Sequence, residues 1–548
     1  MSSSGKGRVR FIGEGRVMLV PDFLRESARL DPEATAVIET QRSITYVELD
    51  RLSNRVANTL LARGVRRGDR VAVALENCIE LVAAYFGIMK TGATVVPLPP
   101  GPRNDRLVRA MADCAPTALV TDTPTWCDAV ASPSFPAVPT VIIHDRVRRL
   151  DGEPTRATGE PSFWVDVVNA ASDAEPLVGT IDLDLAAIIY TSGSTGEPRG
   201  AMLTHANIAA NTESIVQYLH LTSSDRVMCV LPLYYVFGLS LLHTHIRVGG
   251  SVVIDNRFAF PNVVLKSMQD ARVTGFSGVP STFALLLHKS NLATMSFPHL
   301  RYVTQAGGGL PPARIREWLD KMPGVPFYVM YGATEASARL TYLEPADLER
   351  KLGSIGKAIP NVEILVVRDD GTIAEPGEVG ELVARGSNIS CGYWNNPAET
   401  AERFGPLGYR TGDLGYADSE GFLFLVGRKH DMIKVGAHRV GAKEIEDVLS
   451  EHPAIHEAAV VGVSHPILGE APVAFVVGRD GDAPDVGVLV SFCKSHLAAH
   501  KIPIGFAALP SLPKSSVGKI DKGALRETAS RMEWPGAPGT LGHTPTAR

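Results

Sequence analysis

The chain has 548 residues, a hydrophobic fraction of 45%, a charged fraction of 21% and a formal net charge of -5. This length exceeds what one ordinary hydrophobic core holds, so we expect two or three domains. The net charge is slightly negative, whereas proteins that bind nucleic acid or anionic membrane surfaces typically carry a basic excess. The composition therefore argues against those two classes.

Helix and strand patterns alternate through the first half of the chain. Helices are predicted over residues 45–64 and 78–92, and both end at a glycine. Strands are predicted at 70–77, 93–98, 118–122, 141–145, 251–255 and 273–279. This alternation is typical of mainly parallel sheets with helices on their faces.

The pattern changes near residue 353, where short β segments separated by Gly, Pro and Asp turns predict an antiparallel barrel or small sheet. A compact α+β pattern follows it. The expected fold class is therefore α/β: a large N-terminal domain of α/β sheets with a β-barrel-like subdomain, and a small α+β C-terminal domain. The expected boundaries are 15–429, 430–527 and a disordered tail at 528–548, which is rich in Pro, Gly and Thr.

The cysteines and the apolar stretches indicate the cellular location of the protein. The six cysteines are scattered, without a CxxC pair or zinc-ligand spacing, and residues 1–15 lack the apolar core of a signal peptide. The most apolar stretch, 228–242, contains Pro232 and Gly238 and is too short to span a bilayer. We expect reduced thiols, a cytoplasmic location and no transmembrane segment.

The most specific segment is YTSGSTGEPRG at 190–200, between an apolar strand and a helical pattern. Glycines allow close backbone approach, hydroxyls donate hydrogen bonds and successive N–H groups form an anion nest, so the segment predicts a phosphate-binding loop. It is not a Walker A loop, and the alternative is a surface linker. The expected phosphate-binding residues are Thr191, Ser192, Gly193, Ser194, Thr195, Gly196 and Arg199.

This loop, with further motifs in order, resembles the adenylate-forming superfamily of acyl-CoA synthetases, aryl-acid ligases, luciferases and nonribosomal adenylation domains. The further motifs are LPLYYVFG at 231–238, QAGGGL at 305–310, YGATE at 331–335, YRTGDL at 409–414 and LPKSSVGKIDK at 512–522. The resemblance covers nearly the whole chain. One departure is Arg199, where the family usually carries Lys; the positive charge is kept.

The resemblance implies how ATP and Mg²⁺ are bound. Tyr331 would stack on adenine, Thr334 would contact the α-phosphate and Glu335 would coordinate Mg²⁺. The ribose would be held by Asp413 and Arg428. The remaining nucleotide-binding residues expected are Gly308, Gly309 and Gly332.

The resemblance also implies a mobile C-terminal domain that carries the catalytic residue Lys519, whose ammonium would bridge the attacking carboxylate and the α-phosphate. His430 occupies the hinge, where the family usually has Asp or Lys, and its charge depends on pH near neutrality. Ala437 and Arg439 would line the thiol tunnel. Ala437 stands where relatives usually carry Gly, which narrows the tunnel by one methyl group.

The acid-binding pocket is expected around the second and third motifs. Segment 231–238 contains no acidic residue that could pair with an α-amine, so amino acids are disfavoured as substrates. Chain length and aromaticity of the acid stay open, although a role in fatty acid metabolism is expected. The expected pocket residues are Tyr235, Val236, Gly238, Gly278, Val279, Gln305, Ala306 and Met330.

The resemblance implies an ATP-dependent ligase that converts a carboxylic acid to acyl-AMP and passes the acyl group to coenzyme A. One alternative is an enzyme that loads an acyl-carrier protein. A second alternative is a non-catalytic nucleotide-binding protein, which the retained Lys519, Glu335 and Asp413 argue against.

Overall fold

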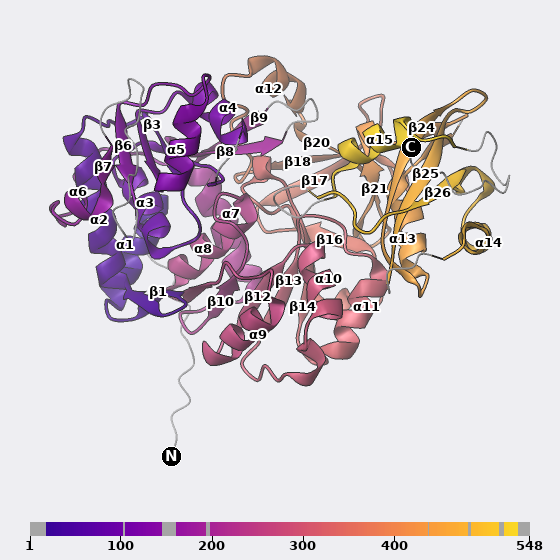
Figure 1. Cartoon of the computed structure of the whole chain (residues 1–548), viewed down its shortest axis with the longest axis horizontal. Coiled ribbons are helices and arrows are strands. Elements are labelled where there is room, and N and C mark those ends of the chain that lie inside the picture. The colour runs from indigo at the N-terminus through magenta and orange to yellow at the C-terminus, as the bar shows by residue number, and fades with distance from the viewer. Residues whose placement is uncertain are drawn as a thin grey trace.

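The computed structural model describes residues 18–101, 105–144, 161–192, 198–436, 438–479, 484–514 and 520–534. Three β-sheets of seven, fourteen and five strands organise this part of the chain. The two larger sheets and their helices form a large lobe, and the five-stranded sheet forms a small C-terminal lobe beside it (Figure 1). The predicted α/β fold class is confirmed by this architecture.

The seven-stranded sheet has the order β7-β6-β5-β3-β4-β8-β9. It is parallel apart from the hairpin of β8 with β9. Its central strands are continuous runs of buried residues, as expected for a parallel sheet covered on both faces. The strands are β3 (Arg70–Ala74), β4 (Thr94–Pro97), β5 (Ala118–Thr121), β6 (Thr140–Ile143), β7 (Ser162–Phe163), β8 (Leu185–Ser192) and β9 (Pro198–Thr204).

Helices of the first half form where the sequence predicts them. Helix α2 begins at a capping box in which Thr45 and Glu48 bond each other's backbone N–H groups, which satisfies the free donors of the first turn. Every residue of α3 is buried, including Lys90, whose ammonium pairs with Asp50 at 2.6 Å. The helices are α1 (Val20–Leu30), α2 (Tyr46–Ala62), α3 (Ile79–Lys90), α4 (Asp105–Cys114), α5 (Thr123–Ala131), α6 (Trp164–Val167), α7 (His205–Leu219) and α8 (Val236–Val248).

The fourteen-stranded sheet has the order β17-β18-β20-β21-β16-β15-β14-β13-β12-β10-β11-β1-β2, and β19 pairs with β20. Strands from β1 through β14 along this order are parallel, and those from β14 to β17 are antiparallel. The β segments expected as an appended barrel or small sheet therefore continue the parallel sheet through β15 and β16.

These elements have the following bounds. The strands are β1 (Thr35–Glu39), β2 (Arg42–Thr45), β10 (Arg226–Cys229), β11 (Ser251–Ile254), β12 (Gly275–Gly278), β13 (Tyr302–Gln305), β14 (Phe327–Tyr331), β15 (Thr341–Leu343), β16 (Ser354–Ala358), β17 (Val362–Val367), β18 (Gly380–Gly386), β19 (Phe404–Gly405), β20 (Gly408–Ala417) and β21 (Leu423–Arg428). The helices are α9 (Pro261–Asp270), α10 (Pro280–Lys289), α11 (Pro312–Lys321), α12 (Pro397–Arg403) and the 3-10 turn η2 (Thr334–Ala336).

The small lobe is a sheet with the order β23-β22-β25-β24, with β26 beside β25, and an apolar cluster on each face. Helix α15 continues to Ser530, and the Trp534 ring packs edge-on against Phe475, so packed chain extends past residue 528. The elements are η4 (Lys429–Asp431), β22 (Ile433–Val435), β23 (His438–Val440), α13 (Ala442–Glu451), β24 (Ile455–His465), β25 (Gly469–Gly478), α14 (Val486–His496), β26 (Gly505–Ala508) and α15 (Lys522–Ser530).

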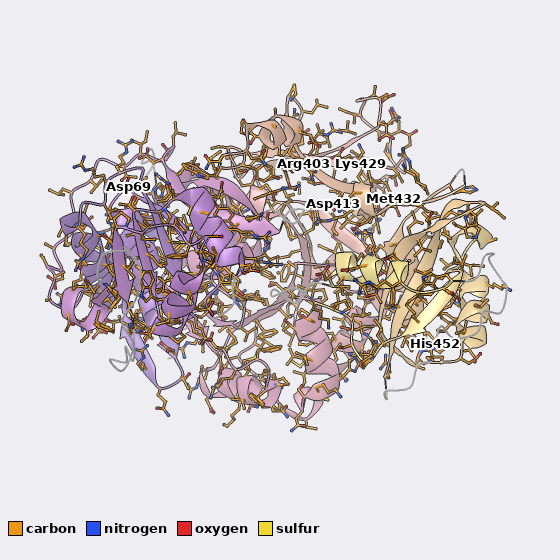
Figure 2. All side chains as sticks on the ribbon, turned by 45° about the horizontal axis from the view of Figure 1, so that its top comes forward. Asp69, Arg403, Asp413, Lys429, Met432 and His452 are labelled. Carbon is orange, nitrogen blue, oxygen red and sulfur yellow. The ribbon has the colours of Figure 1, made fainter. Side chains whose placement is uncertain are left out.

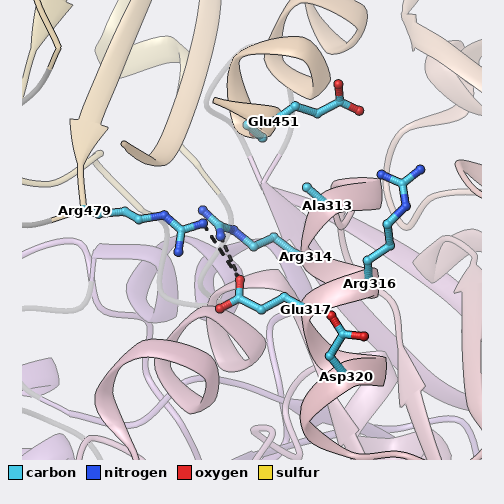
Figure 3. Close-up of a pocket in the computed structure, with 8 residues that line it drawn as sticks. Ala313, Arg314, Arg316, Glu317, Asp320, Glu451 and Arg479 are labelled. Carbon is cyan, nitrogen blue, oxygen red and sulfur yellow. Dashed lines mark hydrogen bonds and ion pairs between the residues drawn. The ribbon is translucent and has the colours of Figure 1, made fainter. Parts of the chain in front are cut away.

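The two lobes meet at α11. The buried Arg314 guanidinium donates to the carbonyls of Ile455 and His456 at 2.9 and 3.0 Å and to Glu317 at 2.9 Å. Figure 3 shows the Glu317 carboxylate joined to both Arg314 and Arg479. These residues line a cavity of about 600 Å³. A charged network therefore holds the small lobe against the large one. None of the helices within the described ranges is long and apolar enough to cross a membrane.

Candidate active site

Three expected site residues end neighbouring parallel strands. Gly278 ends β12, Gln305 ends β13 and Tyr331 ends β14, and Gly278 pairs with Gln305 in the sheet register. Ligands of open α/β sheets bind outside the carboxyl ends of the strands. The expected nucleotide and acid segments therefore converge on one edge of the fourteen-stranded sheet.

Tyr331, Asp413 and Arg428 are joined by a hydrogen bond and an ion pair. The Tyr331 hydroxyl donates to Asp413 Oδ2 at 2.6 Å, and Arg428 Nε lies 3.1 Å from Asp413 Oδ1. Asp413 and Arg428 are direct partners across β20 and β21. Burial, with the Asp413 charge, holds the pKa of Tyr331 well above its ordinary value, and the Asp413 charge raises the pKa of Arg428. The phenol thus stays neutral and the carboxylate is fixed in place.

Glu335 lies on η2, immediately after Thr334, and both side chains are buried. The Tyr393 hydroxyl donates to Glu335 Oε1 at 2.7 Å. The segment that carries Tyr393 also pairs with β9, through the bridge between Ala201 and Tyr393. The strand that follows the expected phosphate loop is thereby joined to Glu335, although these segments are far apart in sequence.

The expected phosphate loop lies in the chain between β8 and β9. Thr191 and Ser192 end β8, and Thr191 faces Arg199 across the hairpin. Arg199 Nη1 lies 2.8 Å from Glu399 Oε1, so a carboxylate of α12 neutralises this cation. Gly193, Ser194, Thr195 and Gly196 lie outside the described residues.

Glycines shape the loop after β13 and the turn after β14. Gln305 Nε2 donates to the Gly308 carbonyl at 2.7 Å. A Cβ on Gly309 would lie 3.3 Å from Lys443 Cε, so a lysine of the small lobe reaches this loop. A Cβ on Gly332 would lie 1.9 Å from the Ala338 carbonyl oxygen, so only glycine permits the close return of the chain after Tyr331.

Two of the expected acid-pocket residues, Tyr235 and Val279, lie beside Gly307. Tyr235 caps α8, and its hydroxyl would lie 3.5 Å from a Cβ on Gly307, with Val279 Cγ1 at 2.9 Å. A Cβ on Gly238 would lie 2.2 Å from the Pro232 carbonyl oxygen, which explains a glycine inside α8. The remaining expected members, all buried, are Val236, Ala306 and Met330.

The expected hinge follows Arg428 directly. His430 lies on η4, half-exposed, and burial of its ring lowers its pKa, although Asp431 opposes the effect. Figure 2 shows Asp413 close to Lys429, at the junction of the two lobes. Arg439 Nη1 pairs with Asp369 Oδ2 at 2.9 Å. Ala437 and Lys519 lie outside the described residues.

Three polar residues of this region were missed by the sequence analysis. Tyr393 and Glu399 contact expected site residues from a segment without a motif of its own. Arg339 is buried next to Met330, with its Nε 3.2 Å from the Met330 sulfur. Only Arg339 had a local signal, a lone cation just after the YGATE motif.

Comparison with known families identifies the class. Residues 24–394 match the AMP-binding enzyme family, and residues 444–519 match the AMP-binding enzyme C-terminal domain. The chain belongs to this family of adenylate-forming enzymes, which confirms the predicted resemblance.

Individual relatives cover almost the whole chain. An indoleacetate–CoA ligase of Aromatoleum aromaticum is 31% identical over 522 residues, which are 94% of this chain and 99% of the relative. The crystal structure of an anthranilate CoA ligase with anthranoyl-AMP is 25% identical, with a TM-score of 0.85 over 94% of this chain and 98% of the other. The O-succinylbenzoate coenzyme A synthetase of Bacillus subtilis in complex with ATP and magnesium is 30% identical, with a TM-score of 0.79 over 93% and 99%. These relatives confirm the predicted enzyme class, an acid–CoA ligase that forms AMP.

Proposed function

We propose that this chain adenylates a carboxylic acid with ATP and then transfers the acyl group to coenzyme A. The observation that carries the proposal is the group of Tyr331, Asp413 and Arg428 at the same sheet edge as Glu335. An aromatic ring, a fixed carboxylate and a guanidinium are groups suited to a nucleoside, and a buried carboxylate beside them is suited to a phosphate-bound cation. The family of the chain supports the same reading.

The nucleoside would be held from two sides. Tyr331 offers its ring to adenine, while the glycine loop with Gly308 and Gly309 permits close approach of a flat base. Asp413 accepts hydrogen bonds from the ribose hydroxyls, and Arg428 reaches the same sugar. Because Asp413 is already held by Tyr331 and Arg428, little reorganisation is needed when ATP binds.

Magnesium fits the residues present. Mg²⁺ is usually bound by one or two carboxylates together with substrate phosphates, and Glu335 presents one buried carboxylate next to Thr334. Tyr393 donates to Oε1 of Glu335 and so orients the group while leaving Oε2 for the ion. When bound, the ion would offset negative charge on the phosphates. Burial, with the Glu335 charge, raises the pKa of Tyr393, which keeps it a donor.

Adenylation joins two anions, so their repulsion is the main obstacle. Arg199 and the β8–β9 loop would hold the leaving phosphates, Thr334 would donate to the α-phosphate and Lys519 would bridge it to the attacking carboxylate. A carboxylate oxygen attacks the α-phosphorus, the bond to the β-phosphate oxygen breaks and pyrophosphate leaves. Catalysis of this kind comes mainly from positioning and fixed charges.

Transfer to the thiol follows as a second step. The thiolate sulfur attacks the acyl carbon, the bond to the AMP oxygen breaks and AMP leaves. We propose that the C-terminal domain, 430–527, turns about His430 between the steps and presents Ala437 and Arg439 to the thiol. A pivot between lobes is a common way to exclude water and exchange catalytic groups. The six free cysteines support the proposed cytoplasmic location.

The identity of the substrate acid is tested directly with a panel of fatty, aryl and amino acids. Purified enzyme, ATP, Mg²⁺ and each acid are mixed with coenzyme A or with a phosphopantetheinylated carrier protein, and pyrophosphate and thioester are measured. We expect pyrophosphate release with at least one carboxylic acid and thioester on coenzyme A. If thioester formed only on the carrier protein, the carrier protein and not coenzyme A would be the acyl acceptor. If no acid gave pyrophosphate, the proposal would be refuted.

A further inference from the structure

Arg339 is a cation in the interior of the large lobe, with 2% of its surface exposed. The chain returns to it through Ser337 and Ala338, whose φ angles of 55° and 121° are unusual for these residues. Asn211 and Asn388 donate to the Arg339 carbonyl at 3.1 and 2.8 Å. The position of this arginine is thus set by a strained turn and two side-chain hydrogen bonds.

The guanidinium has only weak partners. Its Nε lies 3.2 Å from the Met330 sulfur, its Nη1 lies 3.3 Å from the Ala338 carbonyl and its Cζ lies 4.2 Å from the Phe237 ring centroid. The Tyr218 hydroxyl donates to the same Met330 sulfur at 3.1 Å. Within the described ranges of the chain, no carboxylate oxygen comes within 4.0 Å of it. A guanidinium has five N–H donors. None of these donors has a carboxylate partner among the described residues.

Other buried cations of the same lobe do have carboxylate partners. Lys90 pairs with Asp50 at 2.6 Å, and Arg314 pairs with Glu317 at 2.9 Å. Arg339 differs from both, although burial lowers its pKa and therefore opposes its charge. A buried ion without a counter-ion is costly, and a contact with one aromatic face offsets only part of this cost. An anion bound beside the guanidinium would offset this cost.

The position of Arg339 places that anion near the acid. Its guanidinium contacts Met330, an expected pocket residue, and Phe237, which follows the expected pocket residue Val236 in α8. Successive residues of a strand point to opposite faces, so Met330 and Arg339 lie on the face of β14 away from the Tyr331 hydroxyl and Asp413. The cation therefore faces the acyl side of the site and not the ribose side.

We propose that Arg339 binds a second carboxylate of the substrate, so that the preferred acid is a dicarboxylic acid. This inference rests on the proposed function. The planar fork of a guanidinium matches a carboxylate with two parallel hydrogen bonds. The carboxylate that reacts with ATP and the carboxylate that binds Arg339 are at opposite ends of the acid.

The test compares each diacid with its own half-ester. Short and medium α,ω-dicarboxylic acids and benzenedicarboxylic acids are assayed for coenzyme A-dependent AMP formation beside their monomethyl esters, which keep one reactive carboxylate. With wild-type enzyme we expect kcat/KM for the best diacid to exceed that of its half-ester by about a hundredfold, mostly through KM. Equal or better use of half-esters and simple monocarboxylic acids would overturn the inference.

Variants of Arg339 test whether its side chain causes the preference for the diacid. Arg339→Met keeps length without charge and should lower kcat/KM for the diacid by about a hundredfold while leaving the half-ester unchanged or improved. Arg339→Lys should restore part of the loss for the diacid alone. An equal loss for both acids would mean a purely structural role and refute the proposal. If the variants do not fold, the wild-type comparison still decides it.

The outcomes separate this inference from the function on which it depends. Absence of AMP formation with every acid refutes the proposed function. Robust AMP formation with monocarboxylic acids only, and none with diacids, leaves the function intact and refutes the role of Arg339.

Discussion

The Tyr331 hydroxyl and the Asp413 carboxylate share a hydrogen bond of 2.6 Å that joins the end of a parallel strand to an antiparallel one. The bond links the two halves of the fourteen-stranded sheet at the point where the nucleoside is expected. The carboxylate also pairs with Arg428, two residues before the expected hinge residue His430. The same carboxylate therefore connects the nucleoside site with the start of the expected hinge segment.

Asp413→Asn should lower kcat/KM for ATP by about a hundredfold, because it removes the charge that pairs with Arg428 and one acceptor for the ribose. Tyr331→Phe removes only one hydroxyl and should cost about fivefold, in line with a single neutral hydrogen bond. Steady-state kinetics with varied ATP at saturating acid measures both. An Asp413→Asn effect no larger than that of Tyr331→Phe would contradict the ribose-binding role.

Lys519→Ala should slow adenylation by about a hundredfold or more, because one fixed charge at the reacting phosphate is worth about 3–4 kcal/mol of barrier. The matched control is Lys514→Ala, which removes a lysine that pairs with Glu457 at 2.7 Å. Single-turnover formation of acyl-AMP gives the rate of this step alone. Equal rates for both variants would show that Lys519 has no part in adenylation.

The lobe interface should weaken in mild acid. The His288 ring lies 4.9 Å from the His456 ring, beside Glu317 and Arg314, and burial lowers the pKa of His288 to about 4. Its ordinary pKa is about 6.5, so between about pH 6.5 and 4 the unfolded chain binds a proton that the folded chain does not. Stability from this neutral histidine is complete above about pH 6.5 and falls as the pH drops.

The measurement is the thermal midpoint at about pH 7.5 and pH 5.5. At one pH unit below the ordinary pKa the loss is about 1.4 kcal/mol, which corresponds to roughly 1 °C for a chain of 548 residues. His288→Asn should therefore show a smaller drop of the midpoint than wild type, by roughly 1 °C. His299→Asn changes an exposed histidine and should behave as wild type. Identical drops in all three proteins would exclude a contribution of His288.

Gly332→Ala should destabilise the protein by more than about 2 kcal/mol, because its Cβ would lie 1.9 Å from the Ala338 carbonyl oxygen and would force open the turn that carries Thr334 and Glu335. The control is Gly371→Ala, where φ is +85° and no atom lies within 4 Å of the new Cβ, so only backbone strain of about 1 kcal/mol is expected. Thermal unfolding compares the two. A smaller effect at Gly332 would show that the turn relaxes freely.

Much of this architecture could be predicted from local sequence. The helix expected over residues 45–64 is observed as Tyr46–Ala62, because its capping box and terminal glycine lie within the segment itself. The strands β3 and β5 were predictable for the same reason, since continuous apolar runs mark buried parallel strands. The order of the site motifs was equally visible in the chain.

The connection of the antiparallel strands to the parallel sheet was not predictable, because hydrogen bonds between β14, β15 and β16 depend on pairing and not on composition. The partners of the site residues were hidden for a similar reason. Tyr393 reaches Glu335 across 58 positions of sequence, and its own segment carries no motif.

The sequence by itself determined the family, the class of enzyme and the residue types offered to ATP, because each motif is a short stretch whose chemistry is carried by neighbours in the chain. Tertiary structure alone decided which charges have partners. Arg199 meets Glu399 and Arg339 lies against Phe237, because the compensation of a charge depends on atoms within a few ångströms in space, wherever they lie along the chain.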